Sequence, residues 1–322
     1  MLKYRKIEND NDVKLINELW NEESTRGDFY QSWSYENMKE EVFNNKFFKS
    51  DLCYLAFDND LFVGYILGFV KDDNVGYFHS VIIKENYRRT HIATNLFELL
   101  KEAYKKYEIK RVRCVYLCPG GHSWKIPGSK NHLHPSVPAI PFNSLVYFFL
   151  TSVGFYVQGQ IDAFYINLKK YQMSEKITSR IQELKEKGIT FGYYDPKIHY
   201  GLKETCENLG HRNAEEIVNK NIANGDNRPY LVALKDNKVI GYTGYLYNES
   251  DGRAHLDGVY LHSEYRGGGI GKCMFNVLCE ESRKNGSEYM SFFTGLENIA
   301  RYIYISATGK IVQSFAILAW DL

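Results

Sequence analysis

The order of apolar and polar positions repeats along the chain. Residues 54–65 and residues 231–242 each contain two apolar runs around an Asp-Asn pair, and in both segments the second run ends in Gly-Tyr. Two apolar runs of β type joined by a short turn are typical of a β-hairpin. The sequence therefore predicts the same hairpin once in each half of the chain.

An amphipathic helix is predicted behind each hairpin. Residues 86–100 match residues 264–278 at an offset of 178, and the apolar positions of both segments have the spacing of one helical face. These positions are Ile92, Leu96, Leu99 and Leu100 in the first half and Ile270, Met274, Val277 and Leu278 in the second. A third match, at an offset of 155, pairs residues 143–154 with residues 298–309. The chain is thus a duplicated domain whose first copy has 23 additional residues.

Each half is expected to run strand, one or two helices, three-strand meander, helix, strand, helix and closing strand or strand pair. In the second half we expect strands near 189–193, 229–235, 238–247, 253–262, 287–293 and 311–320, and helices near 198–209, 214–223, 270–284 and 297–306. Ser174 is placed to cap a joining helix and Gly188 to end it. The expected fold class is α/β with a mixed sheet, divided into a domain at 1–172, a linker helix at 173–188 and a domain at 189–322.

The additional residues of the first half form a proline-rich insertion at 118–141. Five of the seven prolines lie there, and this density excludes a helix or a central strand. We expect a loop that acts as a lid or as a packing surface between the halves, with Trp124 as its anchor. Cysteine and histidine are zinc ligands, but their spacing in and before this insertion is not that of a standard zinc site, and we expect no metal. The residues concerned are Cys114, Cys118, His122, His132 and His134.

Composition and charge exclude several classes of partner. The chain has 40 Lys and Arg against 39 Asp and Glu, so its overall field favours neither nucleic acid nor an acidic membrane surface. It has no apolar run of the roughly 20 residues that a membrane span needs, and its first residues lack the apolar core of a signal peptide. We therefore expect a cytoplasmic protein whose six cysteines are thiols.

A glycine-rich loop lies between a predicted strand and the helix at 270–284. It reads Arg266-Gly267-Gly268-Gly269-Ile270-Gly271. The start of a helix presents unpaired N–H groups and partial positive charge, and glycines leave those groups open to a phosphate. The loop therefore predicts a pyrophosphate site, the alternative being a turn that only reverses the chain. Its spacing matches neither the nicotinamide nor the nucleoside triphosphate motif.

This loop resembles the acyl-CoA motif of the GNAT superfamily of N-acetyltransferases. Arg266, Gly269 and Gly271 meet the family pattern, and the order of elements fits it twice. The resemblance implies acetyl-CoA as donor, a small-molecule or peptide amine as acceptor, and a monomer or homodimer. The first copy departs from the pattern, because His91 stands where the family has its first glycine. A side chain there crowds the phosphate approach, so we expect the second half to be the principal catalytic unit.

The resemblance also implies roles for residues around the loop. The family's base lies on the preceding strand, at the positions that His255 and Asp257 occupy, and alternation places both side chains on one face. The alternative is that Asp257-Gly258 forms a bulge and His255 is a polar residue without a catalytic part. In the family, backbone near Val259 and Leu261 pairs with the acetyl carbonyl and the pantetheine arm, and Ile270 and Asn298 are further candidates for cofactor binding.

The general acid of the family is a tyrosine on the last helix. Tyr302 and Tyr304 are the candidates, and we expect Tyr304, because Tyr302 has a counterpart in Tyr147 that points to a structural role. In the first half, Tyr77 and His79 occupy the base positions; either this site retains activity or the two residues pack between the halves. Other readings of the whole chain are an acyl or aminoacyl transferase with another donor, or a CoA-binding regulatory module without turnover.

Overall fold

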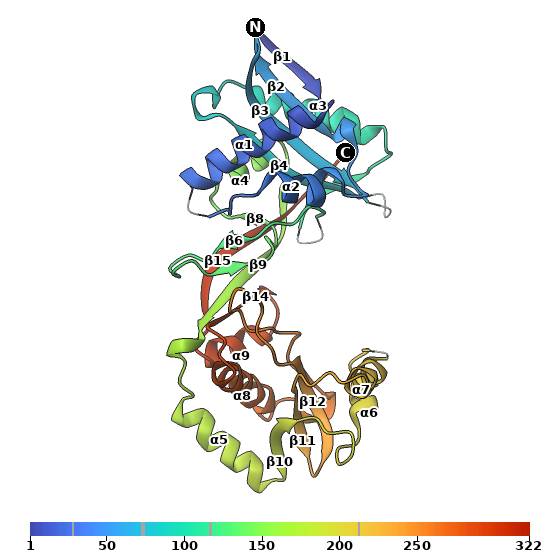
Figure 1. Cartoon of the computed structure of the whole chain (residues 1–322), viewed down its shortest axis with the longest axis vertical. Coiled ribbons are helices and arrows are strands. Elements are labelled where there is room, and N and C mark those ends of the chain that lie inside the picture. Colours follow the sequence, from blue (N-terminus) through green and yellow to red (C-terminus); the bar gives the residue numbers. More distant parts are fainter. Residues whose placement is uncertain (28, 72–74, 116–117, 212) are drawn as a thin grey trace. The chain divides into compact units, whose positions relative to one another are not determined.

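The computed structural model of the chain describes residues 1–27, 29–71, 75–115, 118–211 and 213–322 (Figure 1). These residues form two compact units, one of Met1–Asp162 with Gln313–Leu322 and the other of Ala163–Val312. The predicted domains were divided where one sequence copy ends and the next begins. The two units are instead defined by contacts between residues, and these contacts place Gln313–Leu322 in the first unit. In the described part of the chain, no helix has the length and apolar character needed to cross a bilayer.

The first unit is built on a mixed sheet in the order β1-β2-β3-β4-β5-β15-β9, with β8 paired to β15. All the pairings recorded in this sheet are antiparallel except β4 with β5, which is parallel. Its strands are β1 (Leu2–Lys6), β2 (Cys53–Asp58), β3 (Leu61–Val70), β4 (Gly76–Ile83), β5 (Arg111–Cys114), β8 (Ile140–Pro141), the first part of β9 (Tyr156–Asn167) and most of β15 (Lys310–Asp321). Its helices are α1 (Asp10–Arg26), α2 (Tyr35–Met38), α3 (Ile92–Lys105) and α4 (Leu145–Ser152).

Helices cover both faces of this sheet. Alternate residues of a strand point to opposite faces, so Tyr54 and Ala56 pack with α3 and α4, whereas Leu55 packs with α1. The predicted helical face of α3 is confirmed, because Ile92, Leu96 and Leu100 are buried. Two separate apolar cores hold the first unit together.

The second unit repeats this plan with a smaller sheet. Its strands β10, β11, β12 and β13 pair in that order, and β14 lies next to β9. Their bounds are β10 (Ile189–Tyr193), β11 (Tyr230–Lys235), β12 (Lys238–Tyr245), β13 (Tyr260–Leu261) and β14 (Tyr289–Gly295). The helices are α5 (Glu175–Glu186), α6 (Leu202–Asn208), α7 (Ala214–Ala223), α8 (Ile270–Lys284) and α9 (Ala300–Ser306). Helices α6 and α7 pack on one face of the four-stranded sheet, and α5 and α8 pack on the other.

The predicted hairpins are confirmed in both units. Strands β2 and β3 pair antiparallel through Asp58 and Leu61, and β11 and β12 pair through Lys235 and Lys238. Asp236, between β11 and β12, has a positive φ of 49°, and Asn237 has one of 67°, as a tight hairpin turn of type I′ requires. The duplication read from the sequence is therefore present in the fold.

The insertion at 118–141 was predicted to be a loop without strands, and this was only partly right. Residues Trp124–Lys125 (β6) and Leu133–His134 (β7) form a short hairpin, and β8 joins the main sheet. The prolines lie outside β6 and β7, while Pro141 ends β8. Short paired segments therefore fit between the prolines, which exclude only longer strands.

Candidate functional site

The glycine loop leaves its backbone open at the start of α8. Gly267 and Gly269 have φ of 87° and 79°, a left-handed conformation that glycine adopts without strain. An added Cβ at Gly267 or Gly268 would meet no atom within 4 Å. The Arg266 side chain folds back, and its Nε donates to the carbonyl oxygen of Leu261 at 3.1 Å. The loop therefore has the open approach that a bound pyrophosphate needs.

A cation from the joining helix holds this loop. Arg180 of α5 donates from Nη2 to the carbonyl oxygen of Gly268 at 2.7 Å, and its Nη1 pairs with Glu183 at 2.5 Å. Its Nε would lie 3.6 Å from a Cβ at Gly269. The sequence analysis missed Arg180, because the contact joins residues 88 positions apart and no local motif marks it.

His255 and Asp257 lie in direct contact. The Nε2 of His255 is 2.7 Å from Oδ1 of Asp257, and the other carboxylate oxygen accepts from the Tyr245 N–H at 3.3 Å. The carboxylate packs against Gly244, where a Cβ would overlap it. The imidazole also stacks on Tyr247, with ring centroids 4.3 Å apart. Both partners are thus held in place while part of each remains exposed.

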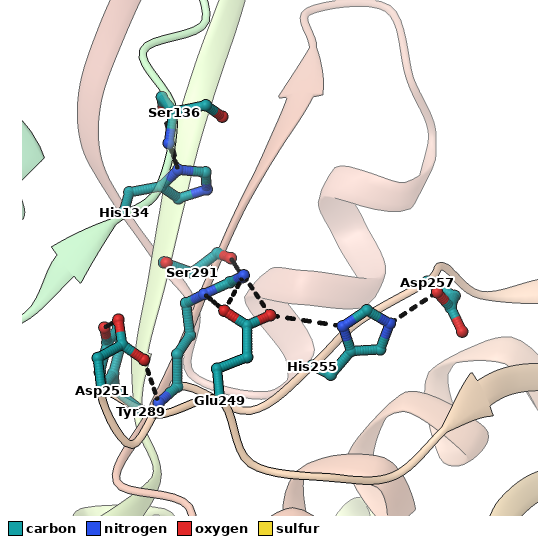
Figure 2. A network of polar contacts seen from close by, with 9 residues as sticks. His134, Ser136, Glu249, Asp251, His255, Asp257, Tyr289 and Ser291 are labelled. Carbon is teal, nitrogen blue, oxygen red and sulfur yellow. Dashed lines mark hydrogen bonds and ion pairs between the residues drawn. The ribbon is translucent and has the colours of Figure 1, made fainter. Parts of the chain in front are cut away.

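A second carboxylate approaches the other ring nitrogen of His255 (Figure 2). Glu249 lies 3.5 Å from Nδ1, and it is itself held by charge-assisted bonds from Nε and Nη2 of Arg253. The hydrogen bond with Asp257 is the main cause that raises the pKa of His255 above its usual value; burial opposes it, and Glu249 adds to it. The result is an imidazole between two carboxylates, which is suited to take up and release a proton near neutral pH.

The backbone at this site differs from the predicted strand. We expected a strand over 253–262, and the structure pairs only Tyr260–Leu261 (β13) with β12. Ala254 donates its N–H to Tyr289 of β14, and the next N–H, of His255, turns to Tyr247. At Gly258 the ring of Tyr260 lies so close that a Cβ would meet it at 2.5 Å. The alternation argument therefore fails here, although the two side chains meet.

The last helix places the two candidate tyrosines differently from the expectation. Tyr302, predicted to be the structural one, is 66% exposed, whereas Tyr304 is buried among Phe164, Phe275 and Phe292. Burial raises the pKa of Tyr304 to about 12, so its hydroxyl keeps its proton at neutral pH. Its role as general acid stays a prediction.

The other predicted cofactor residues lie around β13 and the two helix starts. Asn298 is exposed and accepts from the N–H of Ala300, the first residue of α9, at 2.9 Å. Val259 is half-buried between two cores, and Leu261 pairs with Gly241 in the sheet. A Cβ at Gly271 would lie 3.8 Å from Val259, in ordinary contact distance. The structure thus brings Val259 next to the first turn of α8.

Comparison with known proteins settles the family. A model of the "Acetyltransferase (GNAT) family" matches residues 15–118 and residues 198–302, one region in each sequence copy. The chain belongs to the GNAT acetyltransferase family. Acyl-CoA-dependent acetyl transfer is the general chemistry of this family. No curated protein matches the sequence at a significant level.

Solved structures share the tandem GNAT fold at low sequence identity. A GCN5-related N-acetyltransferase from Sphaerobacter thermophilus has a TM-score of 0.58 at 13% identity, with 99% of this chain and 95% of that chain covered. A tandem GNAT protein from the clavulanic acid biosynthesis pathway has a TM-score of 0.56 at 11% identity, with coverages of 100% and 98%. The glucosamine N-acetyltransferase region of a fungal multi-domain β-N-acetylglucosaminidase reaches 0.63 at 15% identity; 99% of this chain is covered, but only 38% of that protein. These likenesses establish the fold.

The first GNAT copy keeps the loop conformation without its glycines. Arg88 donates from Nε to the carbonyl oxygen of Ile83 at 2.9 Å, as Arg266 does to Leu261. Arg89 and His91 each have φ of 62°, which costs a residue with a Cβ about 1–2 kcal/mol. An open groove of about 720 Å³ runs past these residues to α4. The backbone has the same form in both copies. That this copy binds CoA weakly therefore stays a prediction, and it depends on the side chains of the loop alone.

The base positions of the first copy are both engaged in packing. Tyr77 is buried, and its carbonyl oxygen accepts from the Tyr104 hydroxyl at 2.8 Å. His79 contacts the Ser80 hydroxyl at 2.9 Å and the Gly120 carbonyl oxygen at 3.0 Å, and burial lowers its pKa to about 4. Such an imidazole is a poor proton acceptor at neutral pH.

The insertion packs within the first unit. Trp124 is fully buried, donates from its indole nitrogen to the Ser136 carbonyl oxygen at 2.9 Å, and stacks on Phe29. The Nδ1 of His134 contacts the carbonyl oxygen of Ser136. Cys114 is buried. Among the residues that the structure describes, no group of three His, Cys, Asp or Glu is arranged to hold a metal ion.

Proposed function

We propose that the chain transfers an acetyl group from acetyl-CoA to the amine of a small molecule or peptide, and that its second unit carries the reaction. The observation that supports this most directly is the 2.7 Å contact between His255 and Asp257. A base that removes a proton from an attacking amine needs a pKa near the working pH, and the carboxylate partner raises the pKa of the imidazole above its usual value.

In the proposed reaction the amine attacks the thioester carbonyl directly. A C–N bond forms, the C–S bond breaks, and the thiolate of CoA leaves. His255 accepts the proton that the amine loses, and Asp257 stabilises the imidazolium that results. Tyr304 supplies a proton to the departing sulfur, for which its protonated hydroxyl is suited.

The donor is held by the glycine loop in this proposal. The N–H groups at the start of α8 bind the pyrophosphate, and the open space at Gly267 and Gly268 permits its approach. Backbone groups near Val259 and Leu261 orient the acetyl and pantetheine portions. Arg180 adds a positive charge beside the loop and fixes the carbonyl of Gly268 away from the anion.

The proposal is tested by thiol release from acetyl-CoA with a broad panel of amines. His255→Ala and Asp257→Asn are each expected to lower kcat by about 10²-fold or more with little change in the affinity for acetyl-CoA. His199→Ala, which changes a histidine of the same unit outside this network, is the matched control. Full activity in both variants and in the double variant would remove the pair from the mechanism. Retention of CoA without thiol release for any amine would identify a binding module instead.

A further inference from the structure

The first unit has an open cavity of about 520 Å³ that the proposed reaction does not use. It lies beside α1 and β4, and the insertion supplies part of its wall. Its lining is mainly apolar and aromatic, and includes Trp20, Phe29, Tyr30, Ile140 and Phe142. Pockets of this size with a few polar groups are typical of small-molecule sites.

One polar side chain in this wall makes ring contacts but no hydrogen bond of ordinary geometry within the described part of the chain. His122, from the insertion, lines the cavity and two smaller ones that adjoin it. Both of its ring nitrogens are buried, and neither makes a hydrogen bond of ordinary distance and angle among the described residues, although the Gly120 backbone partly offsets the lowering of its pKa by burial. Its ring lies edge-on to Trp20 at 4.7 Å and near Tyr30 at 5.1 Å. A buried polar group left in this state destabilises the fold, and a hydrogen bond from a ligand would relieve this cost.

The neighbouring histidine, His79, has a hydrogen-bond partner at each ring nitrogen. The Gly120 carbonyl oxygen can only accept, so Nε2 of His79 carries the proton and Nδ1 accepts from the Ser80 hydroxyl. His79 thus holds the turn of the insertion at Gly120, and this turn carries His122 into the cavity. Of these two histidines, His122 is the one whose ring nitrogens are left for a ligand.

The charges around the cavity favour an uncharged ligand. Burial lowers the pKa of His122 to about 3 and that of His79 to about 4, so both rings are neutral at pH 7. Of the described residues that line the cavity, the ones with full charges are Glu23 and Arg88, and they pair with each other at 2.5 Å. A charged ligand would lose its hydration and find no free counter-charge among these residues.

We propose that this cavity binds an uncharged aromatic compound that carries a hydrogen-bonding group, and that His122 is its polar contact. The aromatic walls provide faces and edges for a ring, and the imidazole can both donate and accept. The insertion that carries His122 belongs to the first copy alone, so the second copy has no counterpart of this residue. The site binds and does not catalyse, because so weak a base would not remove a proton at neutral pH.

The test is an NMR titration of the whole protein, labelled with ¹⁵N in its histidine rings, with phenol, toluene and benzylammonium. Phenol is expected to shift the ring nitrogens of His122 and to bind about tenfold more tightly than toluene, which lacks the hydroxyl. His122→Phe should weaken phenol binding about tenfold. His132→Phe, which changes another histidine of the insertion that is not among the lining residues, should bind phenol as the unaltered protein does.

Several results would overturn the proposal. Equal affinity for phenol and toluene, or tighter binding of benzylammonium, would exclude the proposed ligand class. No shift at His122, or unchanged phenol affinity in His122→Phe, would exclude its role. The comparison of the three compounds uses the unaltered protein, so it remains decisive even if a variant does not fold.

Discussion

His91 and Gly269 have the same left-handed backbone conformation, with φ of 62° and 79°, at the residue before α3 and α8 respectively. The two loops therefore differ in their side chains and not in their backbone path. Glycine takes this conformation without cost, whereas histidine carries a Cβ and an imidazole toward the phosphate approach.

This relationship predicts a large difference in CoA affinity between the two units. Gly269→His is expected to lower acetyl-CoA affinity at least tenfold, because one lost charge-assisted hydrogen bond has that effect. His91→Gly should create or strengthen a second site. Titration calorimetry counts the sites; two equal sites in the unaltered protein, or a strong site that survives Gly269→His, would contradict the steric explanation.

Gly268→Ala provides a test that separates binding from stability. No positive φ is recorded at Gly268, and an added Cβ would meet no protein atom within 4 Å. Its free energy of unfolding should change by less than about 0.5 kcal/mol, while acetyl-CoA affinity falls about tenfold. Gly192→Ala, at another open position in the same unit, should change neither quantity. Unchanged affinity in Gly268→Ala would show that the pyrophosphate binds elsewhere.

The pH dependence of turnover should report the pair of His255 and Asp257. The base must be neutral, and its pKa is raised in the structure, so kcat/KM should fall as the pH drops through a value above 6.5. Asp257→Asn removes the main cause of the raised pKa, so the acid limb should move to lower pH while the plateau also falls. A limb that stays in place would mean that another group titrates.

Tyr304→Phe tests the proposed proton donor while its packing is kept. The ring lies among three phenylalanines, so the substitution preserves the core and removes only the hydroxyl. We expect kcat to fall by roughly 10²-fold with unchanged stability. Tyr302→Phe, on the exposed side of α9, is the matched control. Equal rates in the two variants would leave the sulfur to be protonated by water.

Trp124→Ala should strongly destabilise the first unit. The indole is fully buried between Phe29 and Phe315 and donates a hydrogen bond to Ser136. Truncation of such a side chain costs about 3–5 kcal/mol, which denaturant unfolding would measure. Lys130→Ala, exposed on the same insertion, should cost almost nothing. A small loss in Trp124→Ala would mean that the insertion is not anchored by this ring.

Local patterns predicted most of the elements. The helix expected at 270–284 is α8 with the same bounds, and the strand expected at 189–193 is β10. Both segments have an unbroken period in the sequence, of 3.6 residues in the helix and near 2 in the strand. Burial follows the period in α8, whereas in β10 Ile189 is buried and Tyr193, on the same face, is exposed. The glycine loop could also be predicted from the sequence, because a positive φ favours glycine at that same position and depends on no distant residue.

Long-range contacts explain what the sequence did not predict. The strand at 253–262 is mostly lost because Tyr260 packs over Gly258 and Asp257 accepts from Tyr245 on another strand. The loop contact of Arg180 and the buried ring of His122 also depend on residues far away in sequence. No periodicity marks such contacts, so the parts of the candidate site that rest on them became visible only in the structure.

The pairing of β15 with β5 has a consequence for synthesis on the ribosome. Residues Ala319 and Trp320 pair with Arg113 and Val112, so residues that are made after the whole second unit complete the first unit's sheet between β5 and β9. Until they emerge, β5 is an unpaired strand edge, open to pairing with the wrong partner. The nascent first half therefore has to wait for the whole second half before it can close, and a fragment that ends at residue 172 should aggregate when expressed alone.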